Sequence, residues 1–418
     1  MINIGYACLA IAVPGSGMKN TLMKNATGEH LFELIEHNLT ALERLIDYNI
    51  RQGIKLFRIS SDLIPFGSSI AGELPWPDVF SEKLTRIGGL IRAFGMRVSM
   101  HPGQYTVLNS PDPLVVERAI ADLAYHTQVL DAFGVGSECK IILHLGGVYG
   151  DKEQAIGRFI HRYQELPAAI KRRLVLENDD RLFNIRDILE AAKIAGFPVV
   201  YDNLHNAVNP ADPSKTDADW IRTTAATWGP NDGRQKIHYS QQDPAKRIGA
   251  HSPWIKADLF LDFYQTIQGE TLDIMLEVKD KNLSALKCLN LVSNHGIKHL
   301  ENEWARYKYT ILEHSPVIYQ SIRTLLKSKT DYPVREFYEL IEAALSQSIV
   351  MGQATNAADH VWGYFKNQAT ASERRRYSDL LSKYEAGESR LELVKNHLLK
   401  LAVKYQEDYL LTGYYFDL

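Results

Sequence analysis

Histidine and acidic residues follow several apolar runs of this sequence, directly where each run ends. Eight such residues stand at, or shortly after, the end of a run: His101, His144, Glu177, Asp202, His205, His238, His251 and Glu277. In a parallel α/β barrel the C-terminal ends of all strands open onto one face, and that face carries the chemistry. Imidazole and carboxylate groups that converge there can coordinate several divalent metal ions. The pattern therefore predicts a multinuclear metalloenzyme.

A single histidine at a strand end is more often a hydrogen-bonded core residue than a metal ligand. That explanation would have to hold separately at each of the strand-end histidines, and the acidic residues would all have to be ordinary turn residues. Asp202 and His205 add local specificity, because a strand-end carboxylate and a histidine three residues later can reach one ion or two adjacent ions. The combination favours metal binding.

The chemistry of such a cluster depends on how many ions it holds. Two or three ions about 3.5–4 Å apart can activate water and stabilise the leaving oxygen of a phosphodiester. Sugar isomerisation needs only one or two ions, so the large histidine set favours phosphodiester hydrolysis without deciding it. Lys236 and His238 flank Ile237, so both side chains point to the same side of their strand. Lys236 therefore either faces the site or is an interior lysine paired with a carboxylate.

Strand-like runs alternate with amphipathic stretches over the first three quarters of the chain. The runs lie near residues 2–8, 54–59, 97–101, 140–144, 173–177, 198–202, 234–239 and 273–278. Helical spacing of leucine and isoleucine is clearest over residues 29–52, and residues 81–94 and 113–133 behave similarly. Eight strands alternating with helices predict a TIM, or (β/α)8, barrel. A doubly wound sheet would normally carry a glycine-rich phosphate loop after its first strand, and residues 5–8 (Gly-Tyr-Ala-Cys) are not one.

Composition limits the class of protein without naming it. The chain has 418 residues, of which 45% are hydrophobic and 23% are charged, as in globular proteins in solution. No apolar run approaches the roughly 20 residues that span a bilayer, and the sequence starts as a strand without a secretory signal. Three scattered cysteines exclude a disulfide framework. The net charge of −3 leaves a nucleic-acid partner open, because affinity for DNA depends on local basic surface. We expect a cytoplasmic protein.

Several motifs in this order resemble the UV damage endonuclease family over roughly residues 1–300. They are residues 100–105 (Met-His-Pro-Gly-Gln-Tyr), 176–180 (Leu-Glu-Asn-Asp-Asp), 201–205 (Tyr-Asp-Asn-Leu-His), 236–240 (Lys-Ile-His-Tyr-Ser), 276–281 (Leu-Glu-Val-Lys-Asp-Lys), 55–62 and 5–6. The resemblance implies a TIM barrel of the endonuclease IV or xylose isomerase-like type. It also implies an enzyme that nicks double-stranded DNA immediately 5′ of cyclobutane pyrimidine dimers and 6-4 photoproducts, starting an alternative excision repair pathway.

The resemblance also implies a cofactor and a site. The family usually uses Mn²⁺, in a cluster of up to three ions for which Mg²⁺, Co²⁺ or Zn²⁺ can substitute. The implied ligands are His101, His144, Glu177, Asp202, His205, His238, His251 and Glu277. We expect Lys236, Glu177 and Glu277 to be catalytic, and the family's lysine at the position of Lys236 can be carboxylated on its side-chain nitrogen.

Contacts to DNA are implied for a second set of residues. Gln104 and Tyr105 follow His101 on a loop over the barrel mouth, and in the family this pair is thought to probe the damaged duplex. Tyr6 and Arg58, near the ends of the first two strands, are further candidates. Tyr105 has an alternative as a loop aromatic packed on a helix, and Arg58 has one as an interior salt-bridge residue. The turn at residues 9–13 is apolar where a polar DNA contact is expected, which puts the role of the first loop in doubt.

After about residue 300 strand signals vanish and long helical patterns rich in aromatic residues begin. We place a domain boundary there, with a barrel over residues 1–299 and an all-helical domain over 300–418. Residues 356–366 and 391–397 resemble the poorly characterised YbgA-type helical domain, which lends little function. The aromatic residues are expected to pack a helical core, and Arg374, Arg375 and Arg376 are expected to lie on a solvated face.

Two other classes of function stay open at this stage. One is a divalent-metal sugar isomerase or epimerase on the same barrel, and the other is a non-catalytic damage-binding protein. The loop with Gln104 and Tyr105 disfavours the first, and a pure binding protein has no use for so many metal ligands. We therefore expect an endonuclease that acts on DNA containing UV photoproducts, as a monomer, without an organic cofactor or a membrane partner.

Overall fold

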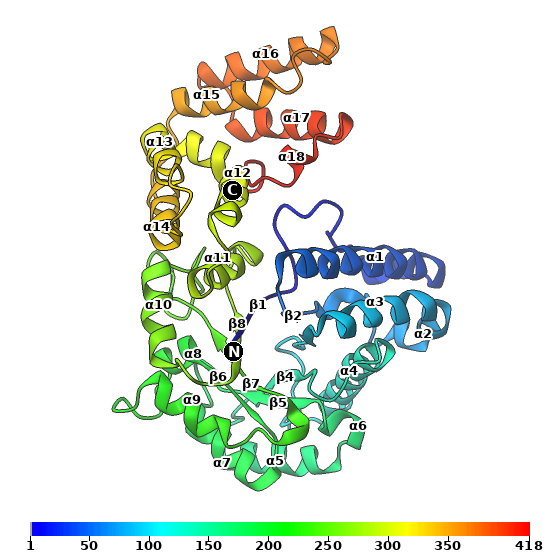
Figure 1. The fold of residues 1–418 in the computed structure, drawn as a ribbon. Helices are drawn as coiled ribbons and strands as arrows, with labels where there is room; N and C mark the ends of the chain where they lie inside the picture. The colour runs from blue at the N-terminus through cyan, green and yellow to red at the C-terminus, as the bar shows by residue number, and fades with distance from the viewer. Residues whose placement is uncertain (1) are drawn as a thin grey trace. The chain divides into compact units, whose positions relative to one another are not determined.

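Eight parallel strands form the centre of the N-terminal part of the chain, within the residues 2–418 that the computed structural model describes (Figure 1). Their bounds are β1 Asn3–Ala7, β2 Leu56–Arg58, β3 Arg97–Ser99, β4 Ile141–His144, β5 Leu174–Glu177, β6 Val199–Asp202, β7 Gln235–Tyr239 and β8 Leu272–Leu276. All eight fall on the runs predicted from the sequence. The chain divides into two compact units, built mainly from residues 15–255 and 287–418.

The strands close into a barrel. Their hydrogen-bonded order is β3-β2-β1-β8-β7-β6-β5-β4, and every pair is parallel. The remaining junction, between β3 and β4, is made by a single parallel bridge from Met100 to Ile141, just beyond the end of β3. This arrangement is the near-closed TIM barrel that the sequence predicts, so the C-terminal ends of all strands lie on one face.

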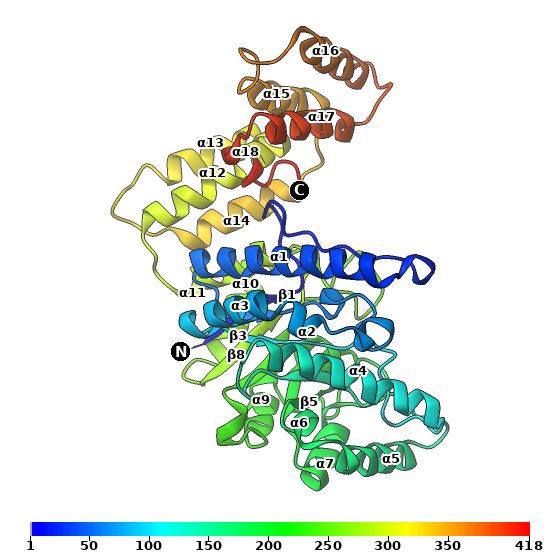
Figure 2. The same ribbon diagram turned by 90° about the vertical axis from the view of Figure 1, so that its right-hand side faces the viewer.

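Helices cover the outside of the barrel strands (Figures 1 and 2). The longer ones are α1 Gly28–Gln52, α3 Ser81–Phe94, α4 Pro113–Ala132, α5 Lys152–Glu165, α7 Ile185–Ala195, α9 Asp217–Ala225, α10 Ala257–Thr266 and α11 Asn282–Val292. Short turns of helix lie at α2 Trp76–Val79, α6 Ala168–Lys171, α8 Asn203–Val208, Met23–Asn25, Ser61–Leu63, Ile70–Glu73 and Pro230–Asp232. Helices α1 and α3 end at Gly53 and Gly95, whose left-handed φ angles of 73° and 66° favour glycine at a helix C-terminus.

A charged layer fills the barrel interior below its mouth. Arg97 on β3 donates to Asp273 Oδ2 on β8 at 2.8 Å and to the backbone carbonyls of Glu138 and Arg234. Asn3 on β1 donates to the other oxygen of Asp273 at 2.8 Å. The pair is buried, so each charge depends on its partner for compensation.

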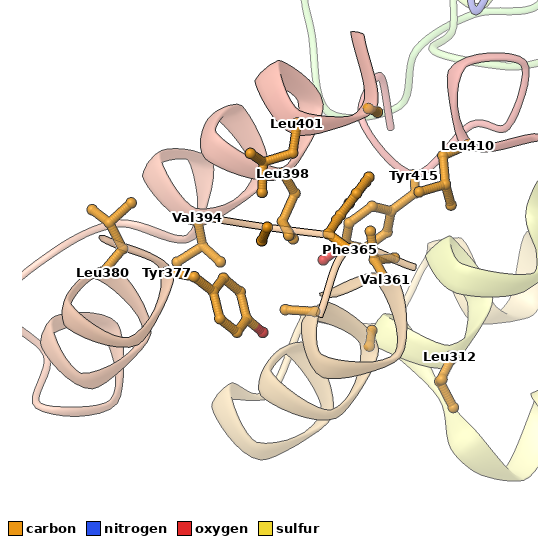
Figure 3. Close-up of a cluster of buried hydrophobic side chains, with 14 residues drawn as sticks. Leu312, Val361, Phe365, Tyr377, Leu380, Val394, Leu398, Leu401, Leu410 and Tyr415 are labelled. Atoms are coloured by element: carbon orange, nitrogen blue, oxygen red, sulfur yellow. The ribbon is translucent and has the colours of Figure 1, made fainter. Parts of the chain in front are cut away.

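The C-terminal unit is helical, as the sequence predicts. Its helices are α12 Ile297–His314, α13 Pro316–Leu325, α14 Val334–Leu345, α15 Met351–Trp362, α16 Ala371–Glu385, α17 Leu391–Lys404 and α18 Asp408–Leu411. The expected domain boundary at residues 299–300 falls inside α12. Figure 3 shows its core, where Phe365, Tyr377, Leu398 and Tyr415 pack together from separate segments. The aromatic residues thus serve packing, and the three arginines at 374–376 are exposed.

Among the described residues, no helix has both the length and the apolar character needed to cross a membrane.

We predict that the buried pair stabilises the barrel far more than a surface pair does. Asp273→Ala leaves Arg97 buried and uncompensated, so the free energy of unfolding should fall by about 3–5 kcal/mol. The matched control is Glu270→Ala, which breaks the exposed pair with Arg222 and should cost at most about 0.5 kcal/mol. Urea unfolding followed by circular dichroism measures both changes, and equal losses would contradict the assignment.

Candidate metal centre

The carboxylate of Glu177, at the end of β5, lies in the middle of the strand-end residues. Its Oε2 atom is 3.3 Å from Nε2 of His101 and 3.7 Å from Nε2 of His144. Its Oε1 atom is 2.8 Å from Nδ1 of His238 and 3.5 Å from Nδ1 of His205. Four imidazoles from four different strand ends therefore surround one carboxylate that is only 1% exposed.

A second carboxylate, Glu277, extends the cluster on the β8 side. Its Oε1 atom lies 3.3 Å from Nδ1 of His238 and 2.5 Å from Nη1 of Arg58. Its Oε2 atom lies 3.9 Å from Nε2 of His251. The two carboxylates thus share His238, and Arg58 supplies a fixed positive charge at one side.

Asp202 and His205 form the third part of the cluster. Asp202 ends β6, and its Oδ1 atom accepts from the backbone N–H of His205 at 2.7 Å, which caps the short helix α8. The ring of His205 is oriented from the other side, because its Nδ1 atom lies 2.8 Å from the carbonyl oxygen of Asn178. Sequence reasoning named Asp202 and His205 but not Asn178, which directly follows Glu177.

The donor set fits divalent cations. One ligand atom from each of His101, His144 and Glu177 lies within 4.8 Å of the others, and the same holds for Glu177, Asp202 and His238. Two buried atoms of the second group, Oδ2 of Asp202 and Nε2 of His238, have no hydrogen-bond partner. A buried polar atom without a partner is costly, so a cation is the natural partner for both. All eight residues predicted as ligands come together here, while their role as ligands stays a prediction.

Burial and mutual charge set the protonation of the cluster. Burial raises the pKa of Asp202 to about 7, although His205 nearby opposes the change. At Glu177 burial also raises the pKa, but His238 and His144 outweigh it and hold the pKa of this carboxyl well below its usual range. For His205 burial lowers the pKa, yet Asp202 and Glu177 raise it to about 10. The cluster without metal therefore holds protons that a cation must displace.

Lys236 lies in the barrel interior on the same side of β7 as His238. It is completely buried, and its Nζ atom has no hydrogen-bond partner. The alternative interpretation paired Lys236 with a carboxylate, but Asp273, the buried carboxylate of the same interior layer, bonds to Arg97 instead. Burial, reinforced by the charge of Arg97, lowers the pKa of the Lys236 amine well below its usual value. A buried amine with a lowered pKa and no hydrogen-bond partner is suited to covalent carboxylation.

A cleft of about 440 Å³ lies beside the cluster. Its lining includes His144 and His205 of the cluster, Gln104 from the β3–α4 loop, and Tyr149 and Arg181. Tyr105, next to Gln104, is 71% exposed, so its predicted alternative of packing on a helix does not apply. Sequence reasoning missed Tyr149 and Arg181, although each follows a strand-end ligand by about five residues on its loop. The cleft therefore gives a ligand access to the histidines of the cluster.

Two predicted DNA contacts require correction. Tyr6 has no exposed surface, and its hydroxyl donates to Asn49 of α1 at 2.8 Å, so it is a packing residue between strand and helix. The prediction that Tyr6 contacts DNA is wrong for this reason. Arg58 pairs with Glu277 inside the barrel mouth, which is the interior salt bridge that the sequence left open. Its guanidinium bonds to the Glu277 carboxylate of the cluster, which favours the salt-bridge alternative.

The fold and the site together define a TIM-barrel enzyme with a histidine and carboxylate centre. Residues 2–308 match the family model described as UV-endonuclease UvdE, and the chain belongs to this family. It is therefore an endonuclease. A UV DNA damage endonuclease of Clostridium perfringens (strain 13 / Type A) is 38% identical over 349 residues, covering 82% of this chain and 83% of that relative.

Further relatives agree with this membership. A UV DNA damage endonuclease of Bacillus velezensis is 33% identical over 292 residues, covering 69% of this chain and 90% of that relative. The crystal structure of SacUVDE superposes with a TM-score of 0.66 at 34% identity, covering 72% of this chain and 99% of that chain. Residues 308–418 match a second family model, described as a protein of unknown function (DUF1722).

We predict that the buried Asp202 makes the metal-free protein less stable as pH rises. The folded protein holds the proton of Asp202 more tightly than the unfolded chain does. The contribution of this proton to the free energy of unfolding is complete below about pH 4 and is lost as pH rises through about 7. Asp202→Asn does not titrate and can still cap α8. Relative to metal-free wild type it should gain roughly 2 kcal/mol of unfolding free energy between about pH 5 and about pH 8.

Urea unfolding in the presence of a chelator measures this difference at both pH values. Asp212→Asn, at a half-buried carboxylate whose pKa is lowered rather than raised, is the control and should show no such gain. A stability difference for Asp202→Asn that is the same at both pH values would contradict the prediction.

Proposed function

We propose that this endonuclease nicks double-stranded DNA immediately 5′ of cyclobutane pyrimidine dimers and 6-4 photoproducts, and so starts excision repair. The observation that carries the proposal is the set of four imidazoles around the buried carboxylate of Glu177. Support comes also from the relatives, which are named UV DNA damage endonucleases. In this proposal the protein acts in the cytoplasm as a monomer, without an organic cofactor or a membrane partner.

The eight clustered residues would hold up to three divalent ions, with Mn²⁺ as the first choice and Mg²⁺, Co²⁺ or Zn²⁺ as substitutes. They are His101, His144, Glu177, Asp202, His205, His238, His251 and Glu277. Such ions supply an activated water and charge stabilisation at the scissile phosphate. Mixed imidazole and carboxylate ligands suit Mn²⁺ and Zn²⁺ better than they suit Ca²⁺, which prefers oxygen ligands alone.

The protein's own groups have distinct roles in this proposal. Glu177 and Glu277 are ionised at neutral pH, because the imidazoles and Arg58 hold both pKa values below the usual range. As anions, both carboxylates would hold the cations that activate the attacking water. The lowered pKa of Lys236 favours the free amine, which could add CO₂ and release a proton to give an anionic carbamate. These three residues are the proposed catalytic groups.

Gln104 and Tyr105 are proposed to recognise the damage. Both are exposed at the rim of the barrel mouth, on the loop that follows His101. A planar amide and an aromatic ring can enter a base stack and occupy the space of displaced bases. Opening the duplex costs a few kcal/mol at intact steps and less at a photodimer, which is already poorly stacked. Recognition by deformability also explains the tolerance for chemically different lesions.

A plasmid assay tests the proposal directly. Purified protein with Mn²⁺ is expected to convert UV-irradiated supercoiled plasmid to the nicked form and to leave unirradiated plasmid intact. Primer extension on the nicked product should place the cut immediately 5′ of dipyrimidine sites. Binding to irradiated plasmid without nicking would favour the damage-binding protein, and epimerisation of a sugar without nicking would favour the isomerase class.

We predict that Gln104→Ala combined with Tyr105→Ala removes the preference for irradiated DNA and leaves the metal content unchanged. The side chains provide the wedge, whereas the contacts of Glu177 that hold the cluster together are made by histidines. Loss of the wedge should cut nicking of irradiated plasmid by at least about 10-fold, equivalent to about 1.4 kcal/mol. Elemental analysis and the nicking assay provide the two measurements.

The matched control is Lys193→Ala combined with Ile194→Ala. These two residues are also exposed, but they lie at the C-terminal end of α7, which is the opposite end of the barrel from the strand-end cluster. Wild-type discrimination by the Gln104 and Tyr105 double variant would refute the wedge role.

A further inference from the structure

The β3–α4 loop is tied to helix α4 on both sides of its exposed tip. On the near side, Ser61 Oγ donates to the carbonyl oxygen of His101 at 2.7 Å and lies 2.9 Å from Nε2 of His126 on α4. On the far side, the hydroxyl of Thr106 donates to Oδ2 of Asp122 on α4 at 2.5 Å. Between these ties stand Gln104 and Tyr105.

Thr106 and the two α4 residues that form the ties are buried, although the tip is not. Asp122, His126 and Thr106 are 5%, 1% and 3% exposed, whereas Tyr105 is 71% exposed. Inside α4, Nδ1 of His126 lies 2.6 Å from the carbonyl oxygen of Asp122, so both residues are held by one turn of helix. Hydrogen bonds to a buried carboxylate are strong. When one is broken, the remaining partner stays buried without a hydrogen bond to protein or water, which is costly.

A second contact fixes the end of the same loop. The amide of Asn109 donates to the carbonyl oxygen of Gly147 at 2.7 Å and accepts from the Gly147 N–H at 3.2 Å. Arg158 donates to the carbonyl oxygen of Asn109 at 2.9 Å. The loop is thus restrained at three points, which are His101 before the tip, Thr106 after it and Asn109 further along the chain. The groups that bind these points lie outside the eight clustered residues.

We propose that Asp122 and His126 are positioning residues for damage recognition, which clamp the loop so that Gln104 and Tyr105 are already in place when DNA arrives. A side chain that is ordered in advance loses less conformational freedom on binding, so the clamp strengthens binding to the lesion. Binding to undamaged DNA depends mainly on phosphate contacts, which the clamp does not alter. This inference rests on the proposed function, because it assumes that the tip reads damaged DNA.

The test compares binding rather than cleavage. The metal-loaded, full-length protein is titrated with a duplex that carries one photodimer preceded by a non-hydrolysable phosphonate linkage, and with the same duplex undamaged. Asp122→Ala should weaken binding to the damaged duplex by about 10-fold and leave the Kd for undamaged duplex unchanged. Amide hydrogen exchange should accelerate over residues 102–107. His126→Ala should act in the same direction.

Two further variants make the result specific. Thr106→Val removes the same hydrogen bond from the loop side without altering α4, so it should reproduce the loss, and adding it to Asp122→Ala should cost little more. Thr127→Val is the control, because the buried hydroxyl of Thr127 donates to the backbone carbonyl of Leu123 within α4 rather than to the loop. This control should bind both duplexes as wild type does.

Two outcomes would overturn the inference in distinguishable ways. Wild-type discrimination by Thr106→Val and Asp122→Ala, with or without faster exchange in the loop, would refute the clamp and leave the proposed function standing. Equal affinity of the wild-type protein for both duplexes would reject the proposed function and the clamp with it.

Discussion

The placement of one buried anion, the carboxylate of Glu177, governs the architecture of this enzyme's centre. A carboxylate without water needs positive charge or hydrogen bonds on each oxygen, and here these come from imidazoles at the ends of four different strands. The groups meet only when the barrel has closed, because β3 and β4 stand at the two ends of the strand order and His101 and His144 reach Glu177 together only across that junction. Folding and assembly of the centre are therefore one event.

The sequence predicted the barrel and the membership of the cluster because both follow from topology. Parallel strands in a barrel share one open face, so residues at strand ends must converge whatever their separation in the chain. The error at Tyr6 has an equally simple cause, since strand residues alternate between the two sides. Ala7 packs inside the barrel, so Tyr6 faces outward to α1, while Arg58 shares the inward side with Leu56.

Other features of the site could not be read from the sequence. The clamp joins Ser61 to His126, which are 65 residues apart, and no local pattern distinguishes a histidine that holds a loop from one that fills a core. The central place of Glu177 among the carboxylates, and the commitment of Arg58 to Glu277, are likewise set by side-chain distances of a few ångströms. The periodicity of apolar residues predicts which face of a strand or helix a residue lies on. Which side chain it contacts on that face depends on the packing of the folded protein.

The sparse pairing between β3 and β4 has a consequence for how the enzyme holds its shape. Only the bridge from Met100 to Ile141 joins these two strands, so this is the seam at which the barrel has the fewest backbone hydrogen bonds. His101 and His144 stand directly above it, one on each side, with ring centroids 5.3 Å apart. A cation bound by both imidazoles would link the ends of β3 and β4 across the seam. Such a cofactor would then also stabilise the closed barrel that binds it.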